Sequence, residues 1–149
     1  MNASNLLSRQ GQRMLQIGIG LFVFSGLEGF AIPRLASPPL GRSVHTLSAL
    51  QGVMALALGL FWPRLHLGAN ASRIAFWTYT YSSFATLVPF MLAALWGAGN
   101  TTIPLAAGEA RGNALQEATI KTILYSAPAP FFISMALMLW GLRTEDEER

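Results

Sequence analysis

Residues 44–61, VHTLSALQGVMALALGLF, form an apolar segment that carries no Lys, Arg, Asp or Glu. A helix needs about 20 such residues to cross roughly 30 Å of hydrocarbon. The segment is followed by Trp62-Pro63-Arg64, where the proline cannot continue an α-helix. In lipid, every backbone N–H and C=O group must be paired, and a helix does this within one segment. Residues 44–61 are therefore predicted to form a membrane-spanning helix.

Three further segments are long and mostly apolar. They are predicted to be helices over residues 14–32, 72–96 and 116–142. The composition agrees, because 52% of the residues are hydrophobic and only 11% are charged, against about 25% charged in soluble domains. The two-residue alternation of a membrane β-barrel strand is missing. The sequence predicts an all-α, integral membrane four-helix bundle in which residues 1–149 form a single transmembrane domain.

The charged residues stand mostly at the ends of these segments, as expected for side chains that anchor helices among lipid headgroups. The net charge of +3 is not gathered into a basic stripe, so no nucleic-acid partner is expected. The arginines on the side of the two termini outnumber the basic residues on the other side. We therefore expect a multi-pass protein of the bacterial inner membrane with both termini in the cytoplasm.

His45 is the first candidate functional residue. The chain has two histidines and no cysteine, so His45 and His66 are its only strong neutral nitrogen ligands for a metal. The helix face that carries His45 is otherwise small, with Ser48, Ala49 and Gly52 at spacings of three, four and seven residues. This face forms a shallow trough that suits either a flat macrocycle or a neighbouring helix, and both interpretations stay open. His66 is predicted to lie in a solvated turn.

A polar stripe runs along the third predicted helix and consists of Tyr79, Ser82, Ser83 and Thr86. Polar groups within a membrane are expected to face protein or a cavity rather than lipid. A serine or threonine can also bond back to its own helix, so the stripe alone does not define a site.

Two carboxylates lie in or beside the apolar segments. Glu28 is interpreted as an interfacial carboxylate paired with Arg34 or Arg42, and the alternative is a direct contact with a substrate. Glu117 and Lys121 are four residues apart in the favourable order and are predicted to pair.

An ordered series of short motifs resembles the hydroxylaminobenzene mutase family. The series comprises GLEGF at 26–30, PR at 33–34, SVH at 43–45, LQGVM at 50–54, AFW at 75–77, GNTTIP at 99–104, AG at 107–108, QE at 116–117 and LWGLR at 139–143. The resemblance extends over residues 14–143. The chain is also similar, more distantly, to styrene oxide isomerase, through His45, Gly52 and the order of the helices.

The resemblance implies a function and a set of site residues. In styrene oxide isomerase the matching histidine binds haem b at a subunit contact of a homotrimer, and the ferric iron acts as a Lewis acid on the epoxide oxygen. By this resemblance His45 would be the metal ligand, and Ala49 and Gly52 would lie beside the haem. The expected reaction is isomerisation of a small aromatic substrate, either arylhydroxylamine to aminophenol or epoxide to aldehyde. The catalytic residues lining the substrate pocket would be Tyr79, Ser82, Ser83 and Thr86.

The chain departs from the family pattern on the third predicted helix. Thr86 stands where both families place an asparagine. The aspartate and tyrosine of the epoxide isomerase fall on Ser82 and Phe90, and the tyrosine of the mutase falls on Phe84. These are groups that would orient the substrate, so the choice between hydroxylamine and epoxide stays open.

Two other functions fit the same residues. A small proton-coupled multidrug-type transporter would use Glu28 as a shared site for proton and substrate. A haem-binding membrane protein without turnover would keep His45 as its ligand. The sequence has no Gly-rich phosphate loop, no Ser-His-Asp arrangement and no paired carboxylates at catalytic spacing. Hydrolysis, phosphoryl transfer and nicotinamide chemistry therefore have no support.

Overall fold

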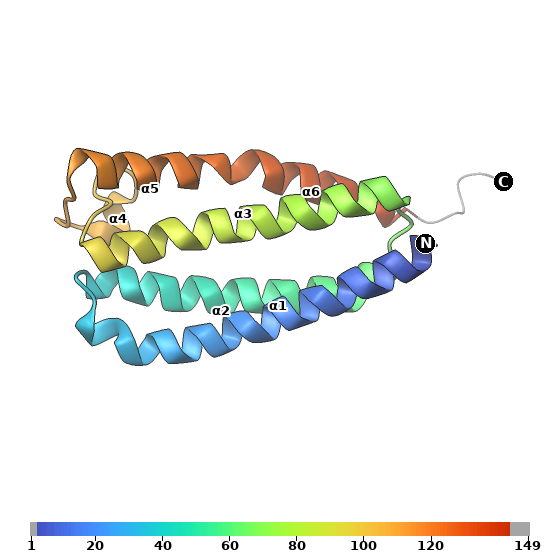
Figure 1. Ribbon diagram of the computed structural model, residues 1–149, viewed down its shortest axis with the longest axis horizontal. Coiled ribbons are helices and arrows are strands. Elements are labelled where there is room, and N and C mark those ends of the chain that lie inside the picture. The colour runs from blue at the N-terminus through green and yellow to red at the C-terminus, as the bar shows by residue number, and fades with distance from the viewer. Residues whose placement is uncertain (1–2, 144–149) are drawn as a thin grey trace.

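A computed structural model describes residues 3–143, and all regular structure in this range is helical. The long helices run side by side along one axis (Figure 1). The α-helices are α1 (Ala3–Ala31), α2 (Pro38–Phe61), α3 (Ala69–Trp96), α4 (Pro104–Ala107), α5 (Ala114–Ser126) and α6 (Pro128–Gly141). Two short 3₁₀ turns, η1 (Ile32–Arg34) and η2 (Trp62–Arg64), follow α1 and α2. The all-α prediction is confirmed.

Three stretches of the described chain are long and apolar enough to cross a membrane, namely Ser4–Arg34, Pro38–Arg64 and Ala114–Gly141. They are consistent with a multi-pass membrane protein. Helix α3 has 28 residues but is not among them. Its polar residues, the stripe included, leave it without a continuous stretch as apolar as those three. The structure therefore confirms apolar, membrane-length helices, whereas the count of four spans stays a prediction.

The helices begin earlier than the sequence predicts. The first predicted helix, 14–32, begins at Ala3, and the second, 44–61, begins at Pro38. Arg9 and Arg13 interrupt the apolar run, but they do not interrupt the helix, because arginine is a good helix former. Apolar runs mark the part of a helix that suits lipid, while the helix itself continues into the polar interface.

Helices α1 and α2 form a tightly packed antiparallel pair in which glycines face glycines. A Cβ atom built on Gly52 would lie 3.1 Å from the carbonyl oxygen of Gly18, and one on Gly59 would lie 2.9 Å from that of Gly11. Small residues at such contacts let two helix backbones approach closely. The SVH–LQGVM region is thereby fixed against α1.

We expect Gly59→Ala to lower the stability of the fold by about 1–3 kcal/mol, because the added methyl group overpacks the contact with Gly11. Alanine is a better helix former than glycine, so the change would otherwise be favourable. Thermal unfolding in detergent measures the effect. Gly20→Ala is the matched control, since a Cβ at Gly20 meets nothing within 4 Å. Equal behaviour of the two variants would contradict the packing argument.

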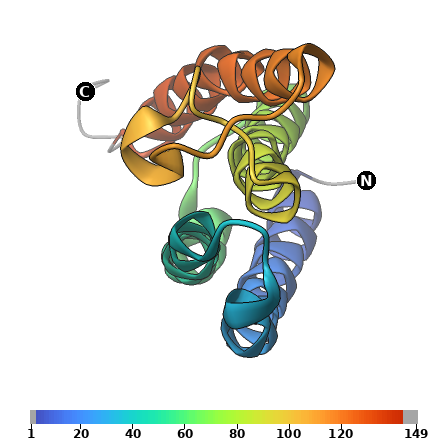
Figure 2. The same ribbon diagram turned by 90° about the vertical axis from the view of Figure 1, so that its left-hand side faces the viewer.

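Helix α3 lies between the α1–α2 pair and the α5–α6 rod (Figure 2). A buried polar cluster joins its first turn to α1 and η2. The Gln10 amide accepts a hydrogen bond from Trp62 Nε1 at 3.1 Å and donates one to the Ser72 carbonyl at 3.3 Å. The Ser72 hydroxyl also donates to Gln10. The sequence did not identify this cluster, because its members are scattered along the chain.

The predicted helix 116–142 is divided into α5 and α6 at Ala127. Pro128 occupies the first position of α6, where a missing N–H group costs nothing. Within a continuous helix the same proline would leave the Leu124 carbonyl without its partner. That carbonyl instead accepts from the Ala127 N–H at 3.2 Å.

Glu117 organises the loop between α3 and α5. Its carboxylate accepts from the backbone N–H groups of Gly99 at 2.7 Å and Gly112 at 3.0 Å, and from the Thr101 hydroxyl at 2.5 Å. The predicted Glu117–Lys121 pair is wrong. Charged hydrogen bonds to backbone donors are stronger than an exposed ion pair, and the Lys121 ammonium lies over the Tyr125 ring, 5.8 Å from its centre.

We expect Glu117→Ala to cost about 2–3 kcal/mol, because two part-buried N–H groups lose their acceptor. Hydrogen–deuterium exchange of residues 97–113 should rise, while α1 and α2 stay protected. Lys121→Ala is the control and should change little. If Lys121→Ala destabilised the protein as strongly as Glu117→Ala, the Glu117–Lys121 ion pair would contribute more than the hydrogen bonds of Glu117 to the loop.

Candidate functional site

The His45 ring is held against α1 through one of its two nitrogens. Its Nδ1 lies 2.9 Å from the Ser25 carbonyl oxygen and 3.2 Å from the Ser25 hydroxyl. That hydroxyl donates to the His45 carbonyl at 2.9 Å. A carbonyl can only accept, so Nδ1 carries the ring proton. In the neutral imidazole, Nε2 is then the nitrogen with the free lone pair, and 45% of the side chain is exposed.

Glu28 is the second polar group at this place, and its side chain is 1% exposed. Its Oε2 lies 3.9 Å from His45 Nδ1. Neither carboxylate oxygen has a hydrogen-bond partner among the described residues. The predicted pairing with Arg34 or Arg42 is wrong, because Glu28 packs against α2 near Gly41 and His45 and forms no ion pair with either arginine in the described structure. Buried polar groups without partners are rare in native proteins, which makes this carboxylate a candidate functional group.

The small-residue trough beside His45 is partly filled by α1. A Cβ on Gly52 would meet Gly18 and Phe22, so the neighbouring helix is the occupant at this point. Ser48 is buried and bonds back to the Val44 carbonyl at 2.8 Å. Ala49 is half-buried one turn from His45. The predicted trough is therefore closed at Gly52. The part that stays open lies beside His45 and Ala49, on the side away from α1.

The polar stripe of α3 lines one cavity, as the predicted pocket requires. The cavity has a volume of about 220 Å³ and is bounded by α2, α3 and α6. Its lining residues are Leu50, Gln51, Met54, Tyr79, Ser82, Ser83, Thr86 and Phe131. The catalytic role of the four stripe residues stays a prediction.

Hydrogen bonds fix the polar side of this cavity. Gln51 donates to the Ser83 carbonyl at 3.1 Å and accepts from the Ser83 hydroxyl at 3.0 Å. Ser82 donates to the Ala127 carbonyl at 2.8 Å. The Tyr79 hydroxyl makes no hydrogen bond within residues 3–143, so it is free to bind a ligand. Gln51 was missed as a lining residue, although an amide within an apolar run was the available signal.

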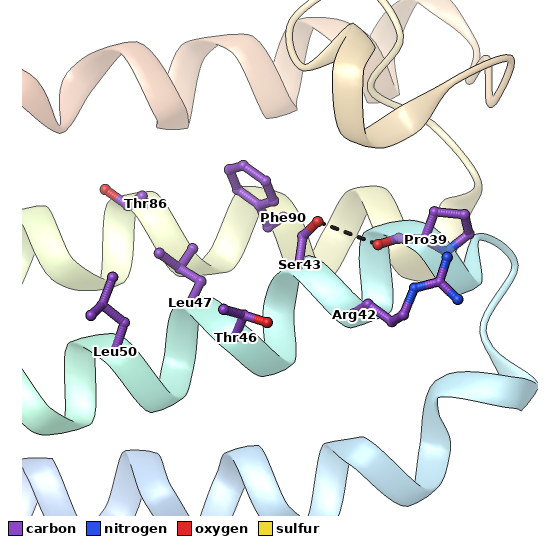
Figure 3. A pocket seen from close by; sticks show the side chains of 8 residues that line it. All are labelled: Pro39, Arg42, Ser43, Thr46, Leu47, Leu50, Thr86 and Phe90. Carbon is purple, nitrogen blue, oxygen red and sulfur yellow. Dashed lines mark hydrogen bonds between the residues drawn. The ribbon is translucent and has the colours of Figure 1, made fainter.

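A wider groove of about 540 Å³ continues from this cavity along α2 and α3, and the two share Leu50 and Thr86. Figure 3 shows the side chains that line it. They are Pro39, Arg42, Ser43, Thr46, Leu47, Leu50, Thr86 and Phe90. Most of this surface is apolar, and Arg42 is its charged residue.

Within one protomer, His45 and the polar stripe do not face the same space. His45 and Gly52 point to α1, whereas Leu47 and Gln51, on the opposite side of α2, point to α3. By the resemblance, His45 would hold the cofactor and the stripe would line the substrate pocket, which places both at one site. The structure separates the two by the width of α2.

His45 suits a metal that is carried in a macrocycle. No group of three or more His, Cys, Asp or Glu residues that could hold an ion occurs in the described part of the chain. A bare metal needs three or four protein ligands, whereas haem iron needs one axial histidine. A metal-binding histidine usually donates its other ring N–H to a carbonyl or carboxylate. His45 does so to Ser25.

The family of the chain follows from comparison with known proteins. The family model for styrene oxide isomerase matches residues 10–143. The chain belongs to the styrene oxide isomerase family. It is 42% identical over 138 residues to hydroxylaminobenzene mutase HabB of Ectopseudomonas oleovorans, covering 93% of this chain and 84% of the relative. Hydroxylaminobenzene mutase HabA of the same organism is 32% identical over 125 residues, which cover 84% of this chain and 93% of the relative. No solved structure matches.

The predicted resemblance to both families is confirmed. Styrene oxide isomerases and hydroxylaminobenzene mutases rearrange bonds within one molecule, and this member of the family is an enzyme of the same class. Family membership thus favours the isomerase over the transporter and over a haem protein without turnover.

Proposed function

We propose that the protein is a membrane-embedded, haem b-dependent mutase that converts an arylhydroxylamine to an aminophenol. The observation that carries the proposal is the state of His45, with Nδ1 bound to the Ser25 carbonyl at 2.9 Å and 45% of the side chain exposed. A hydroxylamine is preferred to an epoxide, because both relatives are hydroxylaminobenzene mutases. Conversion of styrene oxide to an aldehyde is the second candidate, since the matching family model is styrene oxide isomerase.

The reaction needs no oxidant or reductant. The N–O bond breaks and a C–O bond forms at a ring carbon. The proton lost from that carbon is balanced by the proton gained at nitrogen, so substrate and product have the same atoms. When bound, haem iron would act as a Lewis acid that draws electron density from the N–O bond. The chain itself would hold the ligand through Nε2, and Ser25 would keep the imidazole in the required tautomer.

The α3 cavity would hold the aromatic part of the substrate. Its walls are largely apolar, with Met54 and Phe131 among them, and they would exclude water from the reacting bond. The free Tyr79 hydroxyl would bind the polar end of the substrate. The Gln51–Ser83 hydrogen bonds would keep the wall rigid. Ser82 and Thr86 donate to backbone carbonyls, so their oxygens are left as acceptors.

The separation of His45 from this cavity supports an assembled site. If His45 of one subunit and the groove of the next face each other, a flat cofactor is buried between them. We therefore propose a homotrimer in a bacterial inner membrane, with membrane lipid around it and the site at the subunit contact. We also keep the proposal of four spans with cytoplasmic termini, although the termini lie outside the described residues.

Product analysis with two substrates tests the reaction. The detergent-purified protein is incubated in parallel with phenylhydroxylamine and with styrene oxide, without added reductant. We expect aminophenol from the first at a rate at least about tenfold above aldehyde from the second. Aldehyde as the faster product would overturn the substrate assignment. Absence of both products from a folded, haem-loaded protein would overturn the proposed function.

A further inference from the structure

Arg42 lies one turn before His45 on α2, and its side chain is exposed. It lines the groove and reaches toward Pro39 at the start of the helix (Figure 3). Within residues 3–143, no ion pair joins Arg42 to an Asp or Glu side chain. An unpaired guanidinium beside a mostly apolar groove suits a ligand with an apolar body and an anionic end.

The depth of the two residues gives the orientation of such a ligand. Helix α2 begins at Pro38, so at 1.5 Å per residue His45 lies about 10 Å along the helix and Arg42 about 6 Å. A macrocycle held by His45 would present one edge toward the start of α2 and the other toward the middle of the membrane. Haem b carries both of its carboxylates on a single edge. Placing carboxylates in hydrocarbon is costly, so that edge must face the start of α2.

We propose that Arg42, in the groove that faces His45 of the partner subunit, binds the propionate carboxylates of the cofactor and thereby sets its orientation. The inference rests on the proposed function, because it needs a haem at His45. A guanidinium matches a carboxylate with two parallel hydrogen bonds and keeps its charge at the membrane surface. Arg42 is therefore a binding residue that acts on the rim of the cofactor, away from the reacting bond.

The simpler role of Arg42 is to anchor α2 among lipid headgroups. The two roles differ in one property: binding of the cofactor depends on its carboxylates, whereas anchoring of the helix does not. Haemin dimethyl ester has the same macrocycle and iron but no carboxylate charge. It therefore separates binding by Arg42 from a general effect on the helix.

The test titrates cofactor-free protein in detergent with haemin and with its dimethyl ester, and follows the Soret absorbance. We expect Arg42→Ala to weaken haemin binding by about 10- to 100-fold, as removal of a charged hydrogen bond does. The haemin affinity of Arg42→Lys should lie between those of Arg42→Ala and the wild type. The ester should bind to wild type and Arg42→Ala equally well. Arg34→Ala is the matched control, because Arg34 is exposed near the same end of α2 but does not line the groove.

Two results would overturn the inference while leaving the proposed function in place. One is an Arg42→Ala variant that binds haemin as tightly as the wild type. The other is an equal loss of affinity for haemin and for its ester, which would show that Arg42 acts on the helix and not on the carboxylates. A folded wild type that binds neither compound would overturn the proposed function, and the inference with it.

Discussion

Replacement of His45 by alanine is expected to abolish bound haem and to lower the rate of isomerisation by at least about 100-fold. The loss of a hydrogen-bonding partner behind a metal ligand already costs 10- to 100-fold, and here the ligand itself is removed. The fold should survive, because the ring is held at an exposed edge of the α1–α2 pair and not in the core. The measurements are haem content, product formation and thermal unfolding of the same preparation.

Added imidazole provides the internal control for this prediction. An imidazole molecule that fills the space left by His45→Ala should restore part of the Soret absorbance and of the activity. Rescue would assign the loss to the missing nitrogen ligand. His66→Ala should leave both properties unchanged. Full activity of His45→Ala without bound iron would remove His45 from the mechanism.

A milder variant tests the position of the same ring. A Cβ built on Gly29 would lie 3.2 Å from His45 Nδ1 and 3.3 Å from Cε1, so Gly29→Ala should push the imidazole outward by a few tenths of an ångström. Small displacements at a reacting centre are expensive, and we expect a loss of about tenfold in rate. Gly26→Ala adds the same methyl group one turn away, where nothing lies within 4 Å. This variant should leave the rate unchanged.

Glu28→Met is expected to stabilise the protein and to impair its function. The carboxylate is buried and neither oxygen is hydrogen-bonded in the described structure, so an apolar side chain of similar size should add about 1–3 kcal/mol to the free energy of unfolding. Proteins keep such unfavourable groups where function requires them. Because Oε2 lies 3.9 Å from His45 Nδ1, removing it should lower haem affinity and the rate.

Unfolding and activity measured on the same samples decide this prediction. Glu109→Met is the control, since Glu109 is exposed and its replacement should shift stability by less than about 0.5 kcal/mol. A marked loss of stability in Glu28→Met would show that the carboxylate has a stabilising partner. Higher stability with unchanged haem content and rate would show that Glu28 does not support His45.

The sequence predicts the helices well where contact with lipid sets the apolar pattern. It predicts them less well at their ends, where the polar interface and the backbone set the structure. Residues 44–61 and 116–142 were found because their apolar runs match the thickness of a bilayer. The beginning of α1 at Ala3 was missed, since Arg9 and Arg13 belong to the interface and mark the end of the apolar run instead of the end of the helix. The division at Ala127 follows from the backbone of Pro128.

Polar partners were predicted less reliably than helices. Spacing of four residues suggested a Glu117–Lys121 pair, but loop N–H groups from Gly99 and Gly112 come to the same carboxylate through the fold. Proximity in sequence likewise suggested an arginine for Glu28, and packing of α1 on α2 placed it near His45 instead. Contacts between distant segments depend on helix rotation, which local spacing does not specify.

The most direct test of the account is the optical spectrum of the wild-type protein purified in detergent, with the haem quantified after extraction. We expect a Soret band and haem b in a constant ratio to protein, both absent from His45→Ala. A colourless, iron-free wild type that still converts phenylhydroxylamine to aminophenol at full rate would contradict it.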